Sequence, residues 1–518
     1  MTMDPSAQTR PKLSRQQILL LMGGLMTGML LAALDQTIVG TALPTIVGEL
    51  GGIAHYSWVV TAYLLASTAS TLLYGKISDL YGRRPVLLFA ISTFLIGSLL
   101  AGLSQNMTQL IITRGVQGLG AGGLMTLAFT IVSDVVTPRE RGRYQGLFGA
   151  VFGLSSVAGP LVGGYFAEND WRWIFYINVP LGIFALFVCS RVLRLVPHQR
   201  REHRVDYLGA VLMVGGVSAL LLALSWGGNE YAWSSVVILG LLAVGAVLSF
   251  LFVLFEARAQ EPILPLRLFR RRTFSLANAA TFVLGFAMFG SIIYVPLYLQ
   301  IVKGASPTRS GLLMLPMMAG VIVTSIVAGR FISHIGRYKW FPVAGTAIMG
   351  VGLLLFTTLR VETPLWQAFS YMTVIGIGLG LSMQPLILGV QNGLELREMG
   401  AGTSAATFFR SLGGSVGVAA LGAIMTNRLA SGGMSGVPLN SPEKIRQLSP
   451  DVLSKVQDAF VHALHPVFVV AAIVALAGML ITVALPDQPL RGGPSPDQLG
   501  EESAQDAAVE MEAKASTF

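Results

Sequence analysis

The sequence has 518 residues, of which 53% are hydrophobic and only 12% are charged, and its mean hydropathy is +0.67. Soluble domains usually carry about 25% charged residues, so this composition excludes an ordinary soluble domain. The formal net charge of +9 would suit a nucleic-acid partner, but the positions of the basic residues give another explanation below. Cys189 is the only cysteine, which excludes an intrachain disulfide.

Apolar runs of about 20 residues recur along the whole chain. A bilayer core of about 30 Å needs about 20 helical residues to cross it, and the runs are continuous rather than alternating, which favours helices over a closed barrel. We therefore predict an all-α membrane protein with 14 transmembrane helices, the first of them a retained helix rather than a cleaved signal peptide. The predicted spans lie near residues 18–43, 57–74, 86–104, 108–132, 144–167, 172–190, 207–225, 235–255, 274–298, 310–330, 341–359, 365–390, 402–425 and 462–485.

The basic residues are distributed unevenly over the segments that join these spans. With the N-terminus placed in the cytoplasm, 25 of the 35 Lys and Arg residues fall in inner segments, 8 in outer segments and 2 within spans. Cytoplasmic loops carry an excess of Lys and Arg, so we predict the cytoplasmic (inner) membrane as the location, with both termini cytoplasmic. The charge is then an orientation signal, not a sign of nucleic-acid binding, and RLFRRR (267–272) is expected to meet anionic lipid head groups.

Two segments outside the spans are long. Residues 426–461 face outward in this topology, and Ser449 is suited to cap a helix that starts at Pro450. The apolar positions of SPDVLSKVQDAF share one face, which predicts a short amphipathic helix on the outer surface. Residues 486–518 are rich in Pro, Gly and acids, and we predict a disordered tail.

The chain contains an internal repeat. GKISDLYGRR (75–84) matches GRFISHIGRY (329–338), and each follows the second span of a six-span block. Parallel six-span repeats are a transporter architecture with the substrate path at their interface. We therefore divide the chain into an N-terminal tail (1–17), a six-helix bundle (18–192), two inserted helices with basic loops (193–272), a second six-helix bundle (273–485) and a C-terminal tail (486–518).

Several motifs resemble those of one family. GKISDLYGRRP (75–85) resembles the loop 2–3 signature of the major facilitator superfamily, and LDQTIVGTALP (34–44) resembles the first-span signature of its 14-helix drug:proton antiporter group. Further segments resemble the signatures of the fourth span, the fifth span and the entry to the sixth span: RGVQGLGAGG (114–123), SSVAGPLVGG (155–164) and DWRWIFYINVPLG (170–182). The second half resembles the group through the repeat and through GTSAATFFRSLGGSVG (402–417). The resemblance implies two six-helix repeats, two inserted helices and multidrug efflux.

Asp35 is the only ionisable side chain between Ile18 and Gly48. A charge near the bilayer centre costs roughly 2.5–3.5 kcal/mol on insertion scales, and such residues are functional candidates by default. Burial favours the protonated form of a carboxyl group, so an acid that faces each side in turn can carry protons. The same group, once ionised, can hold a cationic substrate, and this competition would give antiport. The alternative is a structural acid that is hydrogen-bonded to a neighbouring helix.

Two arginines lie within predicted spans. Counting residues at 1.5 Å each places Arg114 and Asp35 at similar depth in the outer half of the membrane, so we expect them to approach one another. The nearby cation would favour the ionised acid and oppose the effect of burial; a static buried pair is the alternative. Arg410 is expected either to line the cavity or to pair with an acid elsewhere.

The loop after span 2 supplies candidate gating residues. In the family that GKISDLYGRRP resembles, Asp79 bridges the two halves while the transporter is open outward. A carboxylate is stabilised at a helix N-terminus, and span 13 starts near Gly402 on the same side. Arg83 can turn toward Asp134. The alternative to a gating role is that these residues are solvated surface charges, each worth under about 1 kcal/mol. The full candidate set is Gly75, Asp79, Gly82, Arg83, Arg84 and Asp134.

SSVAGPLVGG spaces small residues at four-residue intervals, and its proline lacks a backbone donor and can bend the helix. We predict a tight, bendable seam against a helix of the other half, although ordinary close packing explains the spacing equally well. The residues concerned are Ser155, Gly159, Pro160, Gly163 and Gly164.

No residue cluster suggests catalysis, a metal site or a cofactor, and His462 and His465 are interpreted as interfacial histidines. A membrane receptor or an intramembrane enzyme is disfavoured because the chain lacks a long sensing domain and a catalytic constellation. We predict a proton-coupled secondary antiporter that exports amphiphilic, cationic or lipid-like compounds; dedicated export of one endogenous lipid or metabolite is the alternative. The expected partners are protons, small amphiphilic substrates and membrane lipids, and the protein is expected to be a monomer.

Overall fold

The computed structural model describes residues 14–50, 56–195, 206–228, 230–395, 398–431 and 449–490. Within these ranges the chain is helical apart from the connecting turns and loops, and the only β pairing there is an isolated bridge between Gly227 and Tyr231. The predicted all-α fold is confirmed. Most of the predicted tails, and most of the outer segment before Ser449, lie outside the described residues.

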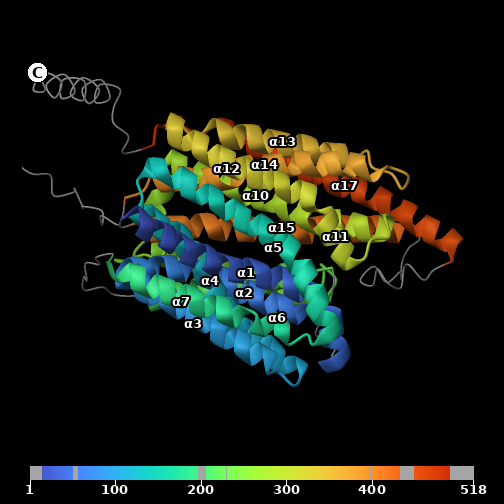
Figure 1. Ribbon diagram of the computed structural model, residues 1–518, viewed down its shortest axis with the longest axis horizontal. Coiled ribbons are helices and arrows are strands. Elements are labelled where there is room, and N and C mark those ends of the chain that lie inside the picture. Colours follow the sequence, from blue (N-terminus) through green and yellow to red (C-terminus); the bar gives the residue numbers. More distant parts are fainter. Residues whose placement is uncertain are drawn as a thin grey trace, which may run out of the picture.

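The first part of the chain forms a helical bundle in the lower part of Figure 1, which we call the N-terminal bundle. Its last predicted span is a helix broken at Ile177, whose helical torsion angles connect the two pieces. The helices are α1 (Arg15–Leu50), α2 (Tyr56–Tyr81), α3 (Arg83–Gly102), α4 (Met107–Val135), α5 (Pro138–Asn169), α6 (Trp173–Tyr176) and α7 (Asn178–Val192).

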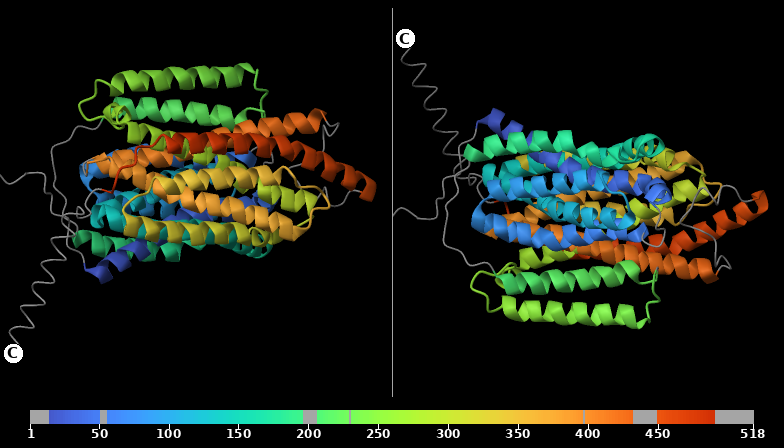
Figure 2. Two further views of the ribbon diagram at one scale, coloured as in Figure 1. Left: turned by 90° about the horizontal axis from the view of Figure 1, so that it is seen from above. Right: turned by 90° about the horizontal axis from the view of Figure 1, so that it is seen from below.

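Two further helices, α8 (Tyr207–Trp226) and α9 (Val236–Glu256), stand together on one flank of the molecule (Figure 2). Helix α8 packs against α2 and α15, and the hydroxyl groups of Thr61 and Ser225 are 2.8 Å apart there. Helix α9 packs mainly on α8 and leaves large apolar side chains such as Phe250 exposed, as expected of a helix that faces lipid.

The last part of the chain forms a second bundle in the upper part of Figure 1, the C-terminal bundle. A 3₁₀ turn, Leu266–Arg270, leads into it, and a π-helical turn, Tyr298–Val302, ends its first helix. Its helices are α10 (Arg272–Leu297), α11 (Pro307–Leu313), α12 (Leu315–Ile335), α13 (Trp340–Phe356), α14 (Leu365–Asn392), α15 (Met399–Ser431) and α17 (Pro450–Val483).

Twelve helices in the described part of the chain are long and apolar enough to cross a membrane. Helix α13 is apolar but shorter, with 17 residues, and α2 carries several Ser and Thr residues. Both pack side by side with the other helices of their bundles. The multi-pass architecture is confirmed, whereas the count of 14 spans and the domain boundaries remain predictions.

The prediction of a separate amphipathic helix on the outer surface is wrong. Ser449 does precede the first helical residue, Pro450, but α17 continues without interruption from there through the last predicted span to Val483. Pro466 lies inside this helix, where it removes one backbone donor without ending the helix. Phe460 is fully buried against the C-terminal bundle, so this first part of α17 packs as an extension of the last span.

The two bundles meet chiefly along two pairs of helices, α5 with α12 and α2 with α15. The ends of α2, α4, α12 and α14 and the start of α15 lie together, and we call this the Asp79 end of the molecule. It is the end predicted to be cytoplasmic. One large buried apolar cluster lies mainly in the C-terminal bundle and two others lie mainly in the N-terminal bundle, and the site described next lies partly inside one bundle and partly between the two.

Candidate functional site

Asp35 lies in the middle of α1, fully buried, and forms an ion pair with Arg114 of α4. The carboxylate Oδ2 is 2.5 Å from Nη1 of Arg114. Gln117, one helical turn after Arg114, donates from Nε2 to Oδ1 of Asp35 over 2.8 Å and accepts from Nη1 of Arg114 over 2.7 Å. The predicted approach of Asp35 and Arg114 is thus confirmed, and Gln117 is hydrogen-bonded to both of them.

Three residues that were not singled out in the sequence contact this pair: Gln117, Asn178 and Tyr63. Asn178, at the start of α7, donates to Oδ1 of Asp35 over 3.4 Å and to the hydroxyl of Ser98 over 3.0 Å. The ring of Tyr63 lies under the guanidinium of Arg114, 4.2 Å from its carbon. The one available signal was spacing, since Gln117 follows Arg114 by three residues and therefore shares its helix face.

All the side chains that bind Asp35 belong to α4 and α7, inside the N-terminal bundle. This placement lies inside one bundle, and the expectation that Asp35 holds a cationic substrate stays a prediction. The placement suits an acid whose charge controls how α1 packs on α4, because a buried charge requires its partner. Protonation would remove the attraction to Arg114 and weaken that packing.

Asp79 links the two bundles at the N-terminus of α15. Its Oδ1 and Oδ2 accept from the backbone N–H groups of Gly400 and Ala401 over 3.0 and 2.9 Å. Arg83 lies between two acids, with Nη1 2.5 Å from Asp79 and Nε 2.6 Å from Asp134. A carboxylate here satisfies free helix N–H groups and favours the positive end of the helix dipole, as predicted.

Close backbone approach surrounds this contact. A side chain on Gly75 would meet the carbonyl of Gly400 and the hydroxyl of Ser404, so only glycine allows α2 and α15 to lie this close. Gly82 has a φ of 95°, a left-handed conformation that favours glycine, and Arg84 donates to the carbonyl of Ser190 over 3.1 Å. Each candidate gating residue therefore has a defined structural contact.

The second copy of the repeat uses backbone groups where the first uses an acid. Ser333 stands at the position equivalent to Asp79, and its carbonyl accepts from Nε of Arg139 over 2.8 Å. Arg139 also donates to the carbonyl of His334 over 2.7 Å, and the N–H of Arg143 donates to the Ser333 hydroxyl over 3.1 Å. These bonds join α5 to α12, so both copies of the repeat fasten the bundles at the Asp79 end.

The predicted seam on α5 is corrected by the structure. A side chain on Gly159 or Gly163 would meet α1, at Thr37 and Ile38, and the carbonyl of Ser155 accepts from the Thr37 hydroxyl over 3.1 Å. These residues therefore pack within the N-terminal bundle, not against the other half. Four-residue spacing shows that one face of a helix is small, but not which helix covers it.

The remaining two residues of the predicted seam, Pro160 and Gly164, do face the C-terminal bundle, as predicted. Pro160 lies against Gly311 of α11, and a side chain on Gly164 would meet Thr308. Nearer the start of the helix, four more glycines of α5 lie against α12: Gly142, Gly146, Gly149 and Gly153. Helix α5 thus has two small faces, one on α1 and one on α11 and α12.

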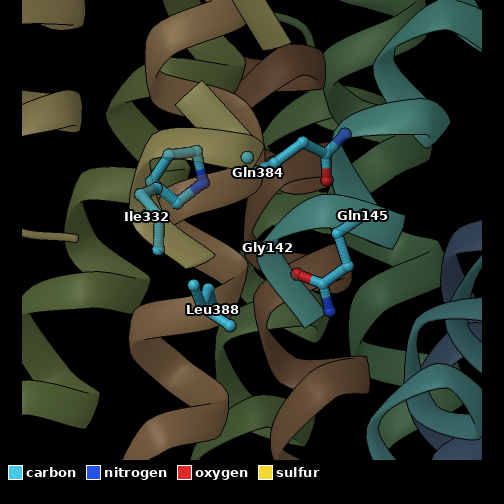
Figure 3. Close-up of a pocket in the computed structure, with 7 residues that line it drawn as sticks. Gly142, Gln145, Ile332, Gln384 and Leu388 are labelled. Atoms are coloured by element: carbon cyan, nitrogen blue, oxygen red, sulfur yellow. The ribbon is translucent and has the colours of Figure 1, made fainter. Parts of the chain in front are cut away.

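A narrow pocket lies at this contact, between α5, α12 and α14 (Figure 3). It is lined by Gly142, Gln145, Gly329, Ile332, Gln384, Pro385 and Leu388. Gln145 donates across to Gln391 over 2.8 Å, which closes the pocket toward the Asp79 end.

Arg410 of α15 is buried and points at the ring of Phe152 on α5, 5.8 Å away. Among the residues that the structure describes it has no acid partner, so the expectation that it pairs with an acid is not met there, and the expectation that it faces the contact between the bundles fits. Gly285 of α10 packs on the Arg410 backbone and fixes this side of α15.

In the described part of the chain no group of three or more His, Cys, Asp or Glu residues is placed to hold a metal ion. His462 and His465 instead make local contacts, to the backbone carbonyls of Asp458 and Leu359 over 2.8 and 3.0 Å. Cys189 is buried in α7.

Comparisons with known proteins agree with this architecture. The sequence profile of the Major Facilitator Superfamily matches residues 25–418 of this chain. An uncharacterized MFS-type transporter of Mycobacterium tuberculosis H37Rv, Rv1877, is 44% identical over 491 residues, which cover 93% of this chain and 71% of the relative. The multidrug transporter protein MdtP of Bacillus subtilis is 39% identical over 521 residues, covering 94% and 96% of the two chains. Multidrug resistance protein 3 of the same organism is 36% identical over 479 residues, covering 88% and 93%.

A similar fold is found among solved structures. The proton:xylose symporter XylE superposes with a TM-score of 0.63 over 92% of this chain and 98% of its own, at 13% sequence identity. The human organic anion transporter MFSD10 gives a TM-score of 0.60 over 90% and 99%, at 14% identity. These similarities concern the fold alone. The family match and the relatives cover most of the sequence, and the chain belongs to the major facilitator superfamily of multi-pass membrane transporters.

Proposed function

We propose that this transporter exports amphiphilic compounds, cationic or lipid-like, across the cytoplasmic membrane in exchange for protons, with both termini in the cytoplasm. The buried pair of Asp35 and Arg114 is the observation that carries the proposal. Asp35 is an acid deep within the bundle, and its attraction to Arg114 depends on its charge. The names of MdtP and multidrug resistance protein 3 support efflux of several compounds.

Proton binding and substrate movement are coupled through α5 in this proposal. Thr37, two residues after Asp35, bonds to the Ser155 carbonyl of α5, and the opposite face of α5 lies on α11 and α12. When Asp35 takes up a proton, α1 and α4 separate slightly, α5 follows α1, and its contact with the C-terminal bundle changes. Small shifts produce a switch when packed interfaces have two stable arrangements.

The acid at the Asp79 end holds the opposite gate. Asp79 and Arg83 keep α2 on α15 in the state described here, and their release would open the end predicted to be cytoplasmic. The substrate then binds between the bundles, where parallel repeats place the transport path.

Proteoliposomes test the proposal directly. The native protein should release protons when a cationic dye such as rhodamine 123 is added to its binding side, and Asp35→Asn should bind the dye without releasing protons. Glu230→Gln, at an exposed acid outside the bundles, is the matched control and should behave as native. Normal proton release by Asp35→Asn would refute the assignment of Asp35, and competition by one lipid or metabolite only would favour the dedicated exporter.

A further inference from the structure

The contact between the bundles contains polar side chain atoms that have no hydrogen-bonding partner among the residues that the structure describes. Nη1 of Arg410, both amide atoms of Gln384 and the hydroxyl of Ser325 are buried and unpartnered. The three side chains are at least nine-tenths buried, with exposed fractions of 5%, 3% and 1%. We call Ser325, Gln384 and Arg410 the interfacial polar cluster.

Three helices of the C-terminal bundle direct these side chains at one turn of α5. The guanidinium of Arg410 lies over Phe152, and a side chain on Gly149 would meet the Ser325 hydroxyl and lie 4.0 Å from Nε2 of Gln384. Gly149 and Phe152 are three residues apart and therefore share a face of α5. Figure 3 shows Gln384 extending from its own helix toward α5.

The cost of this arrangement calls for a ligand. A buried donor or acceptor without a partner destabilises the folded state, and a buried charge without a counter-charge does so more strongly. The same chain neutralises its other intramembrane arginine, since Arg114 is paired with Asp35 at 2.5 Å. Arg410 is thus left with a positive charge at the substrate path, where a bound molecule can supply the missing anion.

We propose that the interfacial polar cluster is a binding subsite for a single negative charge, a carboxylate carried by an amphiphilic substrate. One guanidinium balances one negative charge and donates two N–H groups to the two oxygens of a carboxylate. The amide of Gln384 and the hydroxyl of Ser325 supply further donors, and Phe152 offers an apolar surface to the rest of the molecule. This inference rests on the proposed export function and adds to its expected substrates amphiphilic compounds that carry a carboxylate, which Arg410 would bind more tightly than their esters.

A pair of dyes isolates the carboxylate. Rhodamine 110 carries a free carboxylate, and rhodamine 123 is the same dye with that group blocked as a methyl ester. Binding of each dye to the purified full-length protein in phosphatidylcholine nanodiscs needs no proton gradient, so its result is independent of proton coupling.

Arg410→Gln should weaken binding of rhodamine 110 by about tenfold or more, because the charge and its paired hydrogen bonds to the carboxylate are lost, and change binding of rhodamine 123 by less than about threefold. Arg410→Lys should retain part of the rhodamine 110 affinity, because it keeps the charge but cannot form a bidentate hydrogen bond with the carboxylate. Arg428→Gln, at an exposed arginine of the same helix, should bind both dyes as the native protein does.

Retained rhodamine 123 binding shows that Arg410→Gln is folded. Equal weakening of both dyes by this variant, or unchanged rhodamine 110 binding, would overturn the subsite. Native protein that binds rhodamine 123 but not rhodamine 110 would overturn it as well while leaving the export proposal intact. Failure to bind either dye would overturn the export proposal together with the subsite. The phosphodiester of a lipid is the other source of a single negative charge. If the native protein binds rhodamine 110 more weakly in phosphatidylglycerol nanodiscs than in phosphatidylcholine nanodiscs, and Arg410→Gln shows no such difference, the anion is assigned to lipid and the site is supported.

Discussion

Removing one charge of the Asp35–Arg114 pair should destabilise the protein more than removing both. Asp35 is fully buried and Arg114 is 1% exposed, so neither charge is hydrated if its partner is lost. Breaking a buried ion pair by removing one partner typically costs about 3–5 kcal/mol, whereas replacing both charged groups by neutral ones is often close to neutral.

The contacts of each residue set the expected size of the effect. In Asp35→Asn, Arg114 keeps the Gln117 carbonyl oxygen at 2.7 Å and the Tyr63 ring at 4.2 Å, so we expect the lower end of that range, about 3 kcal/mol. In Arg114→Gln, the carboxyl group can take up a proton and keeps Gln117 as a donor, so the loss should be about 1–3 kcal/mol. The double variant should lose less than about 1 kcal/mol, so the two single losses, about 4–6 kcal/mol together, should fail to add by about 3 kcal/mol or more.

Unfolding of the purified protein by SDS in mixed micelles, followed by tryptophan fluorescence, measures these differences. Dye-induced proton release is measured on the same preparations. We expect the double variant to recover stability without recovering proton release, because it has no titratable group. Losses that simply add would show that the two charges do not stabilise each other, and proton release by the double variant would show that protons bind elsewhere.

Three further predictions concern the ends of the bundle. Asp79→Asn should weaken the contact with the N-terminus of α15 and shift the population toward states open at that end. Cross-linking between cysteines placed near residues 79 and 402 in a cysteine-free background should therefore fall, and transport should slow without a change in which substrates compete. Unchanged cross-linking would contradict a gating role. Gly75→Val should abolish transport, because its side chain would collide with α15, whereas Gly40→Val, where no atom lies within 4 Å of a side chain, should transport normally; equal activity of the two in proteoliposomes would rule out the close approach. The bond from Arg172 holds the pKa of Glu49 below its usual value, so this acid stabilises the protein above about pH 4.5 and loses that contribution as the pH falls below it. Melting temperatures measured between pH 7 and 3 should therefore fall less steeply in Glu49→Gln, by an amount that corresponds to under about 1 kcal/mol, and identical slopes would refute the contact.

The sequence was sufficient to predict depth in the membrane but not rotation about a helix axis. Counting residues placed Asp35 and Arg114 at one level, and the structure joins them. The same counting could not show that Asn178 completes the site, because its position depends on how α7 begins after the break at Ile177. Rotation also explains the error on α5, where the small residues around Gly159 meet α1 instead of the other bundle.

Helix boundaries failed where one signal had to decide between two outcomes. Ser449 and Pro450 mark the start of a helix correctly, but the last span was predicted to begin separately near residue 462, whereas one helix runs through this point with Pro466 inside it. A proline inside a helix loses a single backbone bond, and burial of neighbours such as Phe460 outweighs that loss here. Such tertiary compensation is not visible in a local pattern.

The two halves of the repeat have diverged in where they place charge. In the first copy, Asp35 and Arg114 neutralise each other inside the bundle, and Asp79 fastens its gate with a carboxylate. In the second copy, Ser333 fastens the gate with a carbonyl, and Arg410 is left unpaired at the contact between bundles. A proton site gains from being enclosed, since its titration then changes helix packing, whereas a substrate site must face the path. The asymmetry therefore fits a division in which the first repeat responds to protons and the second binds cargo, with α5 in contact with both.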